Sequence, residues 1–141
     1  MHDPETMRRR MALAAVCEQA ANEIIDRIAG EGVRASESSL TPDFMRRYAD
    51  GIRSAIPGTL DAVREADPAI QASKLDGVAA SIRAVSDGHH VPRLVERGMM
   101  VVGFRLASEV VRRRAQGSGF TADELEGELT WLQEELEQRL S

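Results

Sequence analysis

Two adjacent histidines, His89 and His90, are the side chains in this sequence best suited to bind a metal ion or a haem iron. In a helical protein, a histidine just before an apolar helix is a typical axial ligand of haem. Here Gly88 precedes the pair and Pro92 follows it, so the pattern predicts a turn, in which histidines usually face solvent or cap a helix end. We therefore expect neither a cofactor nor a metal at this turn, with a haem- or gas-binding sensor as the alternative.

Three apolar side chains in the following helix form a second candidate site. Met99 and Met100 are adjacent, and Phe104 lies one helical turn further along. One interpretation is a lipophilic ligand pocket lined by these side chains. The other, simpler interpretation is core packing, because methionine commonly fills irregular gaps in protein interiors.

No motif in the sequence is typical of catalysis. A Gly-x-Ser-x-Gly nucleophile motif is absent, and residues 117–119 lack the preceding strand and the later glycine or lysine of a phosphate-binding loop. Cys17 is the single cysteine, which excludes an intrachain disulfide and a multi-cysteine metal site and fits a reducing compartment. We expect a non-enzymatic protein of the cytoplasm.

The composition predicts one all-α domain over residues 1–141. Hydrophobic residues make up 43% of the chain, which is enough for the core of one ordinary domain. Only five residues are aromatic, whereas Ala, Leu, Glu and Arg are abundant, and this balance favours helix over sheet.

The net charge of −5 is concentrated at the C-terminal end of the sequence, where seven acidic residues in 121–141 stand against Arg139 alone. The remainder is almost neutral, so we expect no nucleic acid as a partner. The arginines at 112–114 suit the C-terminal end of a helix, where cations are favourable. Those at 8–10 are either solvated or in contact with an acidic partner or the acidic last helix.

Residues 98–107 carry one charge in ten, so a helix formed by them is apolar on almost every side. The run is too short for the roughly 20 residues that a helix needs to cross a bilayer, and we expect no membrane contact. The sequence instead predicts a central helix, buried by other helices or by a second copy of the chain.

The hydrophobic periodicity and the capping residues predict about five helices. Gly30 and Gly32 are expected to end the first helix, and Pro57 to kink or split the second. Asp67 is expected to cap the start of the third helix, and Thr121 and Glu124 form a capping box at the start of the last. The expected helices span 5–29, 42–66, 68–86, 92–115 and 121–140.

The last helix, about 121–140, has leucines at the spacing of a coiled-coil seam. The four are Leu125, Leu129, Leu132 and Leu136. Packing on the domain core explains this spacing equally well, since two heptads are too few to establish a coiled coil. The alternative is an exit or dimer helix, whose leucines pair across a homodimer and relay a signal.

The segments 87–95 (DGHHVPRLV) and 103–106 (GFRL), together with the order of the five helices, resemble a bacterial signalling family. They are similar to the N-terminal domain shared by RsbR-type stressosome proteins and PucR-type transcription regulators. The resemblance implies a globin-like bundle without haem that forms a homodimer and acts as the input part of a transcription or stress regulator.

The same resemblance implies that the last helix joins this sensor domain to a regulatory partner or to a fused output domain. The expected function is therefore a signalling input module that acts through protein–protein contacts or through a small ligand. The sequence leaves open the stimulus, the ligand, the partner and the geometry of the dimer.

Overall fold

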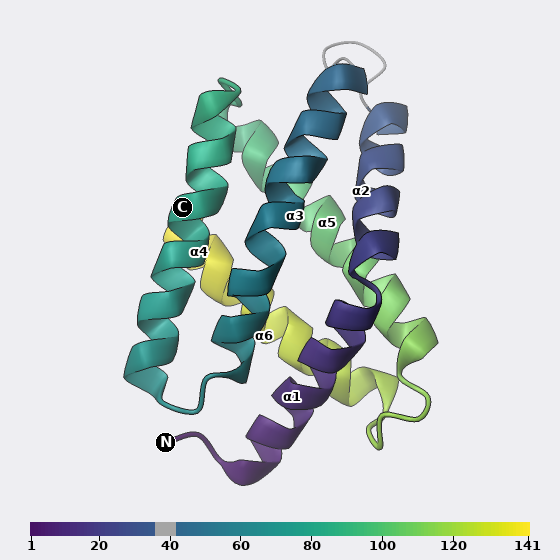
Figure 1. Cartoon of the computed structure of the whole chain (residues 1–141), viewed down its shortest axis with the longest axis vertical. Helices are drawn as coiled ribbons and strands as arrows, with labels where there is room; N and C mark the ends of the chain where they lie inside the picture. Colours follow the sequence, from purple (N-terminus) through teal and green to yellow (C-terminus); the bar gives the residue numbers. More distant parts are fainter. Residues whose placement is uncertain (36–41) are drawn as a thin grey trace.

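The computed structural model describes residues 1–35 and 42–141, and every regular element in these ranges is a helix. The all-α prediction is confirmed, but six helices take the place of the five expected. Figure 1 shows α3 between α2 and α4, with α5 and α6 behind them. The helices are α1 (Pro4–Gln19), α2 (Ala21–Ala35), α3 (Pro42–Arg64), α4 (Pro68–Gly88), α5 (Arg93–Arg114) and α6 (Ala122–Leu140).

The additional helix arises because the segment expected as one helix, 5–29, is divided at Ala20. No glycine or proline stands there, and backbone hydrogen bonds of 3.0 Å still run from Ala20 N to Val16 O and from Ile24 N to Ala20 O. Ala20 is buried and packs with Ile24 and Val110 of α5. The division thus coincides with a tertiary contact, which helical periodicity alone does not reveal.

The expected helix breakers, in contrast, do not interrupt their helices. α2 continues past Gly30 and Gly32 to Ala35, and α3 runs through Pro57 without being split. A glycine inside a helix costs only about 1 kcal/mol relative to alanine. Because α2 and α3 pack against each other, their contacts can offset such local costs.

The capping residues behave as the sequence predicts. The Asp67 carboxylate accepts hydrogen bonds from the backbone N–H groups of Ala69, at 2.8 Å, and Ile70, at 3.3 Å, at the start of α4. At the start of α6, Thr121 Oγ1 accepts from Glu124 N at 3.2 Å, and Thr121 N donates to Glu124 Oε1 at 3.3 Å. These bonds satisfy N–H groups that have no partner within their own helix.

The core draws its fully buried hydrophobic side chains from five helices: Leu13, Val63, Leu75, Leu106, Val110, Val111 and Leu125. A close approach of α3 to α4 depends on Gly51. A Cβ atom at this position would lie 2.7 Å from Val85 Cγ1, nearer than real Cβ contacts allow. Any other residue at position 51 would therefore force the Val85 side chain or the two helices to shift.

α5 is not the fully buried central helix that its apolar segment predicts. Its buried residues are Glu96, Leu106, Val110 and Val111. Leu94, in contrast, is 80% exposed. Burial by other helices of the same chain is incomplete because α5 has neighbours on only part of its circumference, chiefly α2 and α6. The alternative, burial by a second copy of the chain, stays a prediction. Among the described residues no helix is long and apolar enough to span a membrane.

Candidate ligand-binding cavity

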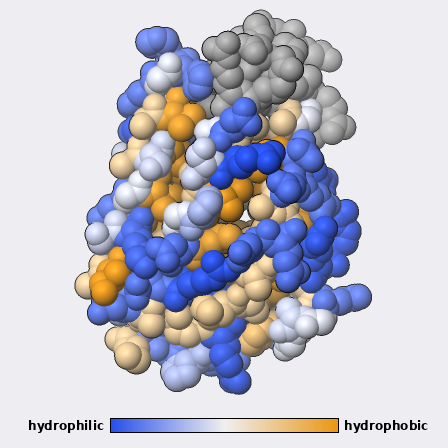
Figure 2. All heavy atoms as spheres, in the orientation of Figure 1, coloured by the Kyte–Doolittle hydropathy of each residue, from blue (hydrophilic) through white to orange (hydrophobic). Residues whose placement is uncertain are grey.

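A cavity of about 170 Å³ lies inside the bundle, with walls contributed mainly by α2, α3, α5 and α6. The described lining is almost entirely aliphatic, aromatic or sulfur-containing, and Glu96 is its one charged residue. Figure 2 shows hydrophobic side chains inside a hollow on the face that carries α3, framed by hydrophilic ones. The site is therefore suited to a small, mostly apolar molecule.

One face of α5 forms a continuous part of this wall. The residues expected to line a pocket, Met99, Met100 and Phe104, all do so. They belong to a series at helical three- and four-residue spacing: Glu96, Met99, Met100, Gly103, Phe104 and Ala107. Glu96 was not predicted as a site residue, although its place three and four residues before the methionines puts it on their side of the helix.

α6 supplies another part of the wall through three of the four seam leucines: Leu129, Leu132 and Leu136. The fourth, Leu125, packs in the closed part of the core, and all four are at most 5% exposed. The structure thus uses the seam for packing within one chain. A dimer contact through these side chains would require α6 to move away from the bundle.

Glu96 is 2% exposed and is held by Arg83 of α4. Arg83 Nε lies 3.2 Å from both carboxylate oxygens, and Arg83 Nη2 lies 3.0 Å from Oε1. The Arg93 guanidinium is more distant, at 3.9 Å from Oε2. A buried carboxylate is tolerated when it is paired and hydrogen-bonded in this way. Arg83 also donates to the backbone oxygen of Leu140, the last residue of α6.

Cys17 of α1 also belongs to the lining of the cavity. Burial raises the pKa of its thiol to about 11. The thiol therefore stays protonated at neutral pH and behaves as a small apolar side chain, not as a nucleophile.

A more polar groove between α2 and α3 adjoins the cavity, and Ile56 and Leu60 contribute to both. Arg53 Nη1 of α3 lies 3.0 Å from Asn22 Oδ1 of α2 within this groove. These side chains bridge α2 and α3 within the groove that shares Ile56 and Leu60 with the cavity.

The N-terminal part of α6 is bound to α1 by a cluster of polar and aromatic groups. Arg9 Nε and Arg10 Nε lie 3.1 and 2.9 Å from the two carboxylate oxygens of Glu128. The Arg10 guanidinium also lies over the ring of Trp131, 3.7 Å from its centroid, a cation–π arrangement. Of the two interpretations of the arginines at 8–10, contact with the acidic last helix applies to Arg9 and Arg10.

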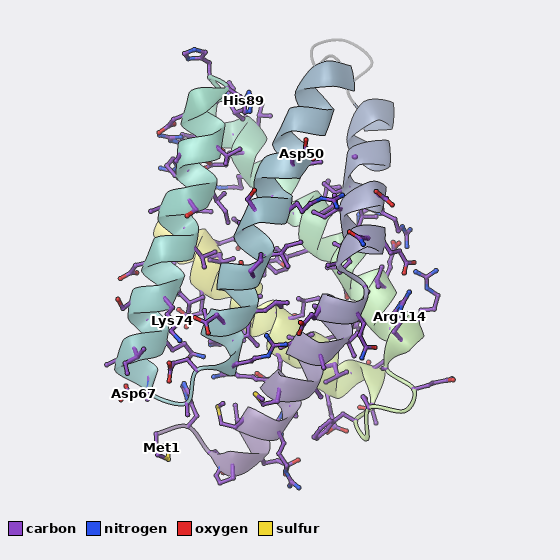
Figure 3. The ribbon with its side chains drawn as sticks, in the orientation of Figure 1. Met1, Asp50, Asp67, Lys74, His89 and Arg114 are labelled. Atoms are coloured by element: carbon purple, nitrogen blue, oxygen red, sulfur yellow. The ribbon has the colours of Figure 1, made fainter. Side chains whose placement is uncertain are left out.

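The arginines at 112–114 close α5, as expected, and also join neighbouring helices. Arg113 and Arg114 both pair with Glu23 of α2, and Arg112 pairs with Glu126 of α6. Burial raises the pKa of Glu23, but the hydrogen bonds and charges of Arg114 and Arg113 outweigh it and hold the pKa below its usual value. Figure 3 shows Arg114 near the end of α5.

Figure 3 shows His89 where α4 ends, far from Arg114, and His90 follows it in the chain. His89 is the C-cap of α4, and His90 is exposed with a φ of 56°. Neither belongs to the described lining of the cavity. Among the described residues, no group of three or more His, Cys, Asp or Glu side chains is placed to hold a metal ion.

Comparisons of the chain with known protein families, with curated proteins and with solved structures found no match.

Proposed function

We propose that this domain is a non-enzymatic signalling input module that binds a small apolar ligand in the cavity and passes the binding event on through α6. The observation that carries the proposal is the composition of the wall. Leucines of α6 and the Met99–Phe104 face of α5 border the same empty space. A ligand that fills this space contacts both the Met99–Phe104 face of α5 and α6, the candidate exit helix.

The volume of the cavity sets the size of the ligand. Drug-sized molecules occupy pockets of roughly 300–1,000 Å³, whereas an apolar cavity of about 150 Å³ holds a molecule the size of benzene. A cavity of about 170 Å³ therefore suits a compact molecule with one ring or a short branched chain. Burial of its apolar surface supplies the binding energy.

α6 is the element through which the signal leaves. Its N-terminal part is fixed to α1 by Glu128, whereas Leu129, Leu132 and Leu136 border the cavity. Filling the cavity therefore changes the packing of α6 from Leu129 onward. The resemblance to stressosome and transcription-regulator input domains agrees with such a role for the last helix.

A filled-cavity variant tests ligand binding. Ala107→Leu adds a bulky side chain to the cavity wall, while Ala80→Leu makes the same change on the exposed surface of α4. Toluene binding, measured by isothermal titration calorimetry, should weaken at least about tenfold in the first variant and stay unchanged in the second. Melting curves verify that both variants are folded. Failure of the wild-type protein to bind any benzene-sized molecule would contradict the proposal.

The module acts as a homodimer in this proposal, and the exposed face of α5 is where a second copy docks. Leu94 is 80% and Val101 46% exposed, and Gly98 lies between them on the same side of the helix. A Cβ atom on Gly98 would meet nothing within 4 Å, which leaves room for a second copy of α5. An apolar patch of this kind on a helix that the sequence predicts to be buried is best explained by a partner.

Sedimentation equilibrium tests the dimer. The double substitution Leu94→Glu and Val101→Glu should convert a dimer into a monomer, whereas Ile70→Glu, at a similarly exposed apolar position on α4, should not. A wild-type protein that sediments as a monomer at all concentrations would overturn this part of the proposal.

A further inference from the structure

The cavity contains one feature that an apolar ligand alone does not explain. The Glu96 side chain, 3% exposed, is the one charged side chain in the described lining, among residues that are otherwise apolar apart from Thr59 and Cys17. A carboxylate in such a wall costs free energy unless its oxygens are satisfied. An alanine or a leucine at this position would close the wall without that cost.

The pairing of Glu96 leaves it able to accept one more hydrogen bond. Arg83 approaches both oxygens at 3.0–3.2 Å and neutralises the charge of the carboxylate. Two carboxylate oxygens have about four lone-pair positions, and the guanidinium fork occupies only part of them. A group in the cavity can therefore donate to Glu96 without displacing Arg83.

The charges around the Glu96 carboxylate determine which class of ligand can bind next to it. An anionic ligand would meet the carboxylate in a poorly solvated wall, where like charges repel strongly. A cationic ligand would compete with Arg83, and with Arg93 at 3.9 Å, for a carboxylate that is already neutralised. A neutral hydrogen-bond donor is not repelled by the carboxylate and does not compete with the two arginines for it.

We propose that the ligand is a small neutral alcohol or phenol whose apolar body fills the cavity and whose hydroxyl group donates a hydrogen bond to Glu96. This inference rests on the proposed function, because it requires that the cavity bind a small molecule. Through Glu96 the bound hydroxyl is linked to Arg83, which also donates a hydrogen bond to the backbone oxygen of Leu140 at the end of α6.

Phenol and toluene provide the test, because they have the same number of heavy atoms and differ in the hydroxyl group. Their dissociation constants are measured by calorimetry on the whole chain and on Glu96→Gln and Glu96→Met. Glu96→Gln keeps the shape and an uncharged acceptor, whereas Glu96→Met removes the acceptor. Glu109→Gln, an exposed position on α5, is the control.

We expect phenol to bind about tenfold more weakly to Glu96→Met, with a smaller loss for Glu96→Gln, while toluene binding changes little in either variant. Equal changes for phenol and toluene would overturn the inference and leave the proposed function intact. Tighter binding of benzoate than of phenol would also overturn it. If the wild-type protein binds neither toluene nor phenol, the proposed function itself fails.

Discussion

The two halves of α6 have different surroundings. Its N-terminal half is closely packed, since Leu125 is fully buried and Glu128 is held between Arg9 and Arg10 of α1. From Leu129 onward α6 borders the cavity through Leu129, Leu132 and Leu136, and its end is joined to α4 by Arg83 and Arg139. A ligand in the cavity therefore contacts the later turns of α6 and not the turns around Leu125. The comparison indicates that the start of α6 is held in place and that a ligand acts on the turns that border the cavity.

The anchored half should show the largest effect of a single substitution. Glu128→Ala leaves the buried Arg10 guanidinium without its carboxylate, and loss of one partner of a buried ion pair costs about 3–5 kcal/mol. Glu135→Ala, which breaks a more exposed pair with Arg139 near the other end of α6, should cost about 1 kcal/mol or less. Urea unfolding measures both. Similar losses for the two variants would remove the difference between the halves.

Leucine truncations probe the same comparison in the core. Leu125→Ala removes a side chain that is packed on all sides and should cost about 3–4 kcal/mol. Leu136→Ala removes one that already borders the cavity and therefore has fewer contacts to lose, so its cost should be about 1 kcal/mol smaller. Unfolding free energies that are equal, or in the reverse order, would indicate that the cavity is filled in solution.

The smallest effect on stability is expected for the exposed ion pairs at the C-terminal end of α5, in which Arg113 and Arg114 contact Glu23. The pKa of Glu23 is lowered from its ordinary value of 4.5, so the folded state binds the proton less readily than the unfolded state. The stability from this pair is present above pH 4.5 and is lost as the pH falls through the lowered pKa. In Glu23→Gln, the free energy of unfolding should fall less steeply as the pH is lowered through that range. A salt concentration of 1 M should reduce the difference between the variant and the wild type.

Much of the fold follows from local signals in the sequence. The capping box of Thr121 and the Asp67 cap mark the starts of α6 and α4, because hydrogen bonds between near neighbours form them. The division at Ala20 has no such local signal. It coincides with packing of Ala20 against Val110, a residue far away in the sequence. Pro57 is a strong local signal for a helix break, yet it lies inside α3, which continues through it.

The candidate site was predictable in part for the same reason. Met99, Met100 and Phe104 share a face of one helix, so their spacing brings them together. Glu96 lies on that face too, but its partner Arg83 belongs to another helix, and only the folded arrangement joins the two. The isoleucines that α2 and α3 contribute to the wall also depend on how the helices pack.

A titration with toluene followed by amide NMR tests the central claim most directly, because it reports on both halves of α6 in one experiment. We expect saturable chemical-shift changes in residues 96–107 of α5 and 129–140 of α6, with little change at Arg9, Arg10 and Leu125. The absence of saturable shifts, or shifts of equal size in the anchored half, would contradict the account.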